Sequence, residues 1–106
     1  MFKINNITWY VKFVPSYDDS LRRSDGSIAI GMCDNNAKTI YINETLSGKL
    51  LKKVLCHEIT HAAMFSYDID LTLEQEEVVA DLITSYGEEI VQITDTIFNK
   101  LRREIE

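Results

Sequence analysis

Residues 55–64 read LCHEITHAAM, and this short stretch contains both histidines of the chain, His57 and His61. Proline is absent from residues 47–65, where apolar residues recur at spacings of three and four. That spacing predicts a helix with one apolar face. Residues four apart lie on the same face of a helix, so the two imidazoles are expected to project side by side. Glu58, which follows His57 directly, is expected one residue further round the helix.

The arrangement H-E-x-x-H in residues 57–61 favours a metal site. Neutral imidazole nitrogen is a preferred ligand of zinc, and two imidazoles one helical turn apart can bind the same ion. Zinc lowers the pKa of bound water and polarises a carbonyl group. A carboxylate beside such a water can accept its proton. We therefore predict His57 and His61 as ligands of Zn²⁺, and Glu58 as a general base.

A third protein ligand is needed, because catalytic zinc usually has three, with one position left for water. Cys56 points about 100° away from His57 on a helix, and we predict that it is buried as a small apolar residue. Since no third histidine exists, a carboxylate is expected. The segment EQEEVVADLI, residues 74–83, supplies several on a second helix.

Glu77 and Asp81 are four apart and share one face of this second helix. We predict Glu77 as the third ligand. Asp81 is predicted to accept the free N–H of a ligating histidine, which fixes the tautomer of the ring. Glu76 and Glu74 remain alternatives to Glu77, because sequence fixes the rotation of a helix only loosely.

The rest of the chain predicts an α+β fold. Residues 7–14 alternate between apolar and polar side chains, as expected of a strand that Pro15 ends. Two further β-rich runs flank an Asp/Asn-rich turn and predict a hairpin, with strands at 27–33 and 38–43. Thr72 and Gln75 form a capping-box pattern at the start of the second helix. We expect a three-stranded N-terminal sheet packed on two C-terminal helices.

Composition limits the possible functions. A length of 106 residues suits a single domain over residues 1–106. The net charge is −6, and the few basic residues are dispersed, which argues against a nucleic-acid partner. No segment has the length and apolar character of a signal sequence or a membrane span, so we expect a soluble cytoplasmic protein with no membrane partner. The oligomeric state is left open.

The sequences HEITH and EEVVAD resemble the zincin metallopeptidases. E-x-x-x-D after H-E-x-x-H is similar to the gluzincin branch, and the short spacing resembles compact phage and mobile-element peptidases related to the ImmA/IrrE group. The resemblance implies a small zincin-like domain. It also implies that His57, His61 and Glu77 bind zinc, that Glu58 acts as the base and that Asp81 supports a ligand.

The same resemblance implies an edge strand ahead of the first helix that binds an extended substrate by main-chain pairing. The segment KTIYIN, residues 38–43, occupies this place in the sequence. A β-rich run can bind a peptide by strand addition. We therefore expect Ile40, Tyr41 and Ile42 to bind substrate.

The resulting hypothesis is a zinc-dependent metallopeptidase that hydrolyses a peptide bond in a protein partner. One alternative is a catalytically silent, metal-binding interaction or accessory protein of phage or mobile-element origin. Another is a helical binding module without a metal. No residue stands out as a stabiliser of an oxyanion, because Tyr86 is expected on the opposite face from Glu77 and is predicted to pack in the core.

Overall fold

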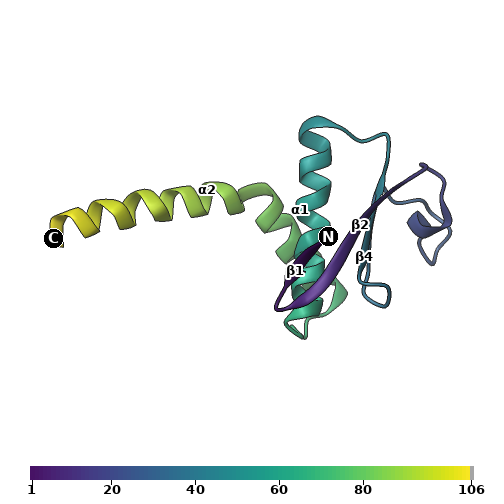
Figure 1. Ribbon diagram of the computed structural model, residues 1–106, viewed down its shortest axis with the longest axis horizontal. Coiled ribbons are helices and arrows are strands. Elements are labelled where there is room, and N and C mark those ends of the chain that lie inside the picture. The colour runs from purple at the N-terminus through teal and green to yellow at the C-terminus, as the bar shows by residue number, and fades with distance from the viewer. Residues whose placement is uncertain (106) are drawn as a thin grey trace.

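The computed structural model describes residues 1–105 and has the predicted α+β class (Figure 1). Strands occupy the first half of the chain and two helices the second. In chain order the elements are β1 (Phe2–Ile4), β2 (Ile7–Val14), a short 3-10 helix η1 (Asp19–Leu21), β3 (Gly31–Asp34), β4 (Thr39–Asn43), α1 (Gly48–Ser66) and α2 (Leu73–Ile105).

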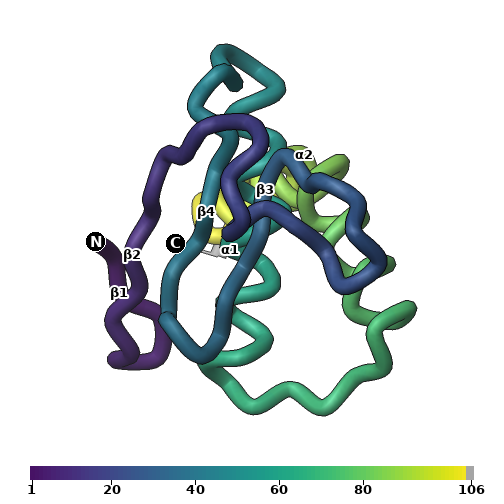
Figure 2. The backbone as a smooth tube through the Cα atoms, turned by 90° about the vertical axis from the view of Figure 1, so that its right-hand side faces the viewer, coloured from purple at the N-terminus to yellow at the C-terminus, as the bar shows by residue number. Residues whose placement is uncertain are grey.

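The sheet has four strands in the order β1-β2-β4-β3, so the prediction of three strands is wrong (Figure 2). The pairs β1–β2 and β3–β4 are antiparallel, whereas β2 and β4 are parallel. The additional strand, β1, is three residues long and too short to show a periodic pattern. It turns into β2 through Asn5 and Asn6, whose φ angles of 49° and 65° suit a tight hairpin turn.

The predicted hairpin of β3 and β4 is confirmed, with Gly31 opposite Ile42 and Cys33 opposite Ile40. Its first strand is shorter than predicted, because regular pairing begins at Gly31 rather than at Ser27. Ile28 and Ile30 are 40% and 46% exposed. In this segment Ala29 is the buried residue, at 3% exposed.

The prediction that residues 38–43 form an edge strand is wrong. β4 lies inside the sheet, where β2 pairs with one of its edges and β3 with the other. Ile40 and Ile42 are fully buried, and the half-buried Tyr41 points to the opposite face of the strand. Strand addition at Ile40, Tyr41 and Ile42 is therefore excluded, because the main-chain groups of β4 are already paired. The edge strand on this side of the sheet is β3.

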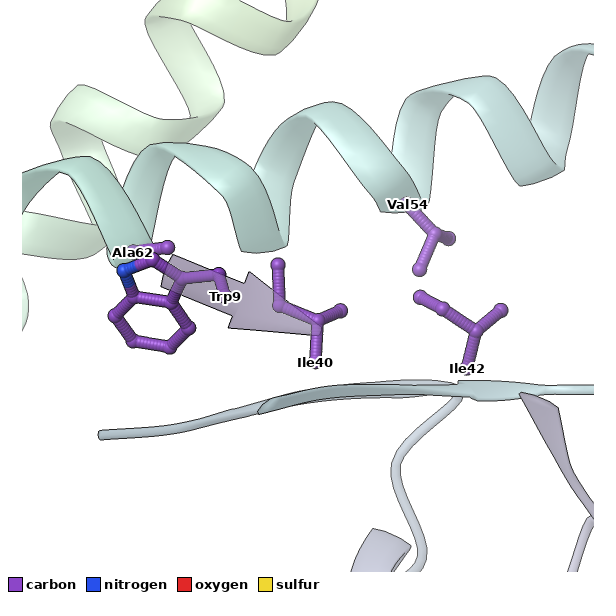
Figure 3. Packing of buried hydrophobic residues seen from close by; sticks show 5 residues of the cluster. All are labelled: Trp9, Ile40, Ile42, Val54 and Ala62. Carbon is purple, nitrogen blue, oxygen red and sulfur yellow. The ribbon is translucent and has the colours of Figure 1, made fainter. Parts of the chain in front are cut away.

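Helix α1 covers one face of the sheet and completes the core (Figure 3). Val54 and Ala62 point from α1 towards Trp9, Ile40 and Ile42 on the strands. At the end of the helix, the indole N–H of Trp9 donates to Ser66 Oγ at 2.8 Å, and both residues are buried. This hydrogen bond fixes the end of α1 that follows the two histidines.

Helix α2 begins at the predicted capping box. The backbone N–H of Thr72 donates to Gln75 Oε1 at 3.0 Å, and that of Gln75 donates to Thr72 Oγ1 at 3.2 Å. Near the core, α2 lies on the far side of α1 from the sheet, so the prediction that both helices pack on the sheet is wrong (Figure 3). Its C-terminal part projects from the body (Figure 1). Within residues 1–105, neither helix combines the length and apolar character that crossing a membrane requires.

Candidate metal centre

Helix α1 places His57 and His61 on one face, one turn apart. Their Nε2 atoms are 3.2 Å from each other, and the ring centroids are 4.9 Å apart with the planes inclined at 65°. The side chains are 23% and 11% exposed. The two rings therefore direct the same nitrogen, Nε2, towards a shared point near the protein surface.

Glu77, in the second turn of α2, brings a carboxylate to this point. Its Oε2 lies 3.2 Å from His57 Nε2, and its Oε1 lies 2.9 Å from His61 Nε2. Among the described residues, one group of three or more His, Cys, Asp or Glu side chains has ligand atoms that converge on one point. It consists of His57, His61 and Glu77. The convergence expected from the sequence is thus present. The capping box directly before Glu77 sets the start of α2, and hence the position of this carboxylate.

The other nitrogen of each ring, Nδ1, faces a second carboxylate. His57 Nδ1 lies 3.4 Å from Asp81 Oδ1, in the place that the sequence predicted for Asp81. His61 Nδ1 lies 2.7 Å from Glu76 Oε1, and both side chains are about nine-tenths buried. In a metal site, a carboxylate at Nδ1 holds the ring proton there and leaves Nε2 as an electron-pair donor.

The role of Glu76 was missed in the sequence analysis, which considered this residue only as an alternative to Glu77. Each imidazole ligand has one remaining nitrogen that needs a partner, so two histidines predict two supporting carboxylates. Counting the two remaining ring nitrogens could therefore have assigned both Glu76 and Asp81 as hydrogen-bond partners of the ligating histidines. The structure places Glu76 against Nδ1 of His61 and Glu77 against both Nε2 atoms.

The donor set fits a cation. When the ring protons lie on Nδ1, two nitrogen lone pairs and a carboxylate face one another at about 3 Å, and a cation between them would stabilise this arrangement. Ligands about 2.0–2.1 Å from a tetrahedral zinc are about 3.3 Å from each other. The distances between the converging atoms of His57, His61 and Glu77 are 3.2, 3.2 and 2.9 Å and approach this value. Nitrogen and carboxylate donors are also the types that zinc prefers.

Glu58 lies beside the three converging side chains, with its carboxylate between α1 and β3. Only 8% of the residue is exposed. Burial raises the pKa of this carboxyl group above its ordinary value, and the charge of Glu77 adds to the effect, whereas His61 and His57 oppose it. A carboxylate with a raised pKa accepts a proton more readily than an exposed one.

Gly31 allows β3 to approach α1 at this place. A Cβ atom at residue 31 would lie 2.6 Å from Val54 Cγ1 and 3.2 Å from Glu58 Cγ. The 2.6 Å distance is shorter than packed carbon atoms allow, and the 3.2 Å distance is tight, so only glycine fits here without movement of the neighbouring atoms. The close approach brings the edge strand of the sheet next to Glu58.

Two cavities meet at His57 and Glu58. One, of about 330 Å³, extends past His61 and Cys33 towards Glu76 and Glu77 at the start of α2. The other, of about 550 Å³, extends along α1 towards Leu50, Lys53 and Asp81. Arg23 lines both. A molecule in either cavity would reach the carboxylate of Glu58.

Cys33 is an unsuitable ligand, although it lines the smaller cavity. Burial raises the pKa of its thiol to about 12, and the charges of Glu58 and Glu76 contribute to the same direction. The thiol is therefore protonated at neutral pH, whereas zinc binds the thiolate. Both cysteines are free.

Comparisons of this chain with models of known protein families, with curated proteins and with solved structures give no match. Its function must therefore be inferred from the chemistry of the site itself.

Proposed function

We propose that this protein is a zinc-dependent metallopeptidase in which His57, His61 and Glu77 hold the metal and Glu58 acts as the base. One observation carries the proposal: two Nε2 atoms and a carboxylate converge at about 3 Å, next to a buried glutamate and two open cavities. A purely structural site has no need of Glu58, whose burial as a carboxylate is costly. This is also the arrangement that the resemblance to the zincins implies.

In this proposal each residue of the site has a separate chemical role. A zinc ion held here would polarise a carbonyl group and acidify a water molecule. Glu58 accepts a proton from the attacking water and later delivers it to the leaving amine. Asp81 and Glu76 keep the protons of the two rings on Nδ1, so that both Nε2 atoms remain free to bind the metal.

The proposed substrate is an extended segment of a protein or peptide that pairs with β3. The backbone N–H of Asn43 donates to the carbonyl oxygen of Ile30 at 3.0 Å. Hydrogen-bonded and non-bonded pairs alternate along an antiparallel ladder, so the main-chain groups of Gly31 and Cys33 point away from β4. Within residues 1–105 no strand occupies that outer edge. A peptide added there lies beside Glu58.

The test compares the zinc-loaded protein with Glu58→Gln. Each is incubated with a pool of denatured proteins, and new peptide termini are identified by mass spectrometry. Glu58→Gln keeps the size of the side chain but removes the proton acceptor. We expect it to retain one zinc per chain and to lose at least about a hundredfold in cleavage rate. Glu74→Gln is the matched control, because this exposed residue takes no part in the site.

A Glu58→Gln variant that cleaves at the rate of the unaltered protein would rule out Glu58 as the base. If the unaltered protein binds stoichiometric zinc but yields no new termini from any pool, the peptidase proposal fails. The second hypothesis, a catalytically silent metal-binding accessory protein, would then take its place. In that protein the metal would serve to link α1 to α2.

A further inference from the structure

The C-terminal part of α2, residues 86–104, forms an arm that contributes nothing to the metal centre. It projects from the body of the protein (Figure 1). Every residue from 88 to 104 is exposed. An arm of this length spans about 27 Å at 1.5 Å per residue. A helix of this size is only marginally stable alone in water and is normally stabilised by packing.

One face of the arm is apolar and uncovered. Its members are between 51% and 58% exposed and recur at spacings of three and four: Tyr86, Ile90, Ile93, Ile97 and Leu101. Such spacing is typical of helices that pack against another helix. The prediction that Tyr86 packs in the core is therefore wrong. Tyr86 belongs to an apolar helix face that the body of the protein does not cover.

The charges of the arm are divided along its length. Residues 86–95 carry three acidic side chains and no basic one, whereas residues 96–105 carry three basic side chains and one acidic one. A parallel pair of such arms would place like charges side by side, and an antiparallel pair would place the acidic half of one against the basic half of the other. Glu88 already lies 3.6 Å from Lys52 of its own α1, and the charges that flank the apolar face and complement each other in the antiparallel direction are Glu89 and Arg103.

We infer that two copies of this protein associate through an antiparallel pair of these arms. Ile93 and Ile97 of one copy pack at the centre against Ile97 and Ile93 of the second. Each a position then faces a d position, as in an antiparallel coiled coil. In this register Glu89 lies opposite Arg103 of the second copy. The two bodies, each with its metal centre, lie at opposite ends of the pair.

A membrane surface is a less suitable binding partner for the apolar face than a second copy of the protein. Helices that lie on anionic membranes usually carry Lys and Arg along their polar face. Here Glu88, Glu89 and Asp95 make the first half of the arm acidic. Repulsion of this half from an anionic surface opposes binding, whereas a second copy offers it a basic partner.

The first experiment measures the mass of the full chain by sedimentation equilibrium. We expect a dimer that dissociates on dilution, and a shift to monomer in Ile93→Asp, because the substitution buries a charge at the centre of the pair. Gln92→Asp adds the same charge to the opposite face of the helix and is expected to remain dimeric. The zinc content and the Trp9 fluorescence of both variants verify that the body is folded.

The second experiment tests the antiparallel direction. Glu89→Lys and Arg103→Glu each introduce repulsion, and we expect each to weaken the dimer about tenfold. The double variant Glu89→Lys/Arg103→Glu restores opposite charges and is expected to recover most of the affinity. Asp95→Lys, on the outer face of the helix, is the control for net charge and is expected to change the affinity less. Failure of the double variant to recover would overturn the antiparallel register.

A chain that is monomeric at every concentration up to about 1 mM would overturn the inference, as would a dimer that is unaffected by Ile93→Asp. Co-sedimentation of a monomeric chain with phosphatidylglycerol vesicles would overturn it in favour of a membrane surface. None of these outcomes depends on peptidase activity, so the inference can fail while the proposed function stands.

Discussion

The protonation state of Glu58 affects the stability of the fold. In the metal-free protein, burial raises the pKa of this carboxyl group above its ordinary value of 4.5. The folded state therefore favours the protonated form. The stabilisation from the protonated group is fully present below the pKa of the unfolded chain and is lost as pH rises through the higher pKa of the folded state.

We therefore expect metal-free Glu58→Gln to unfold at a higher temperature than the unaltered protein near pH 8, because the amide is neutral at every pH. The difference should shrink on acidification and become small below about pH 4.5. Thermal unfolding measured between about pH 4 and about pH 8 checks both the sign and the pH range. An unaltered protein that is more stable than the variant near pH 8 would contradict this prediction.

The sequence predicted the positions of His57, Glu58, His61, Glu77 and Asp81 well, because helical periodicity alone decides which side chains share a face. It could not distinguish the tasks of Glu76 and Glu77. These neighbours differ by about 100° in direction, and only the packing of α2 against α1 fixes which carboxylate reaches Nδ1 and which reaches Nε2. The roles of all these residues in binding metal stay predictions.

Among the elements, the contact between β3 and α1 determines how closely the main chain of β3 approaches Glu58. Gly31→Ala places a methyl group 2.6 Å from Val54 Cγ1 and 3.2 Å from Glu58 Cγ, so β3 must move away from α1 or Glu58 must shift. We expect a loss of about 1–3 kcal/mol in the free energy of unfolding. Urea denaturation followed by the fluorescence of Trp9 measures it.

Val54→Ala provides the internal control for this contact, since it removes the atom that the new methyl group would meet. The double variant should lose less stability than the two single changes together. Equal stability of Gly31→Ala and the unaltered protein would show that β3 and α1 are not in this close contact.

The order of strands was less predictable than the strands themselves. Alternation identified β2, and an Asp/Asn-rich turn between two β-rich runs identified the hairpin, but neither pattern shows which edge of β4 faces β2. The parallel pairing of β2 with β4 moves β4 into the sheet and makes β3 the edge. This rearrangement transfers the proposed substrate contact from Ile40, Tyr41 and Ile42 to the main chain of Gly31 and Cys33.

In the whole molecule, α2 has two parts. Its first three turns bring Glu76, Glu77 and Asp81 to α1, and residues 86–104 form the arm that projects from the body. The second helix predicted from the sequence is present as a single helix, Leu73–Ile105. An apolar stripe does not reveal what covers it, so the prediction that Tyr86 packs in the core was wrong.

In the proposed site, one zinc ion links α1 to α2 through two imidazoles and a carboxylate. X-ray absorption at the zinc edge, recorded on the protein with one bound zinc, identifies these ligands. We predict nitrogen and oxygen neighbours at about 2.0–2.1 Å, with the scattering pattern of imidazole. Glu77→Gln is expected to lose bound zinc, whereas Glu74→Gln is expected to give the spectrum of the unaltered protein. A sulfur neighbour at about 2.3 Å, or a purified protein that retains no zinc, would contradict the account.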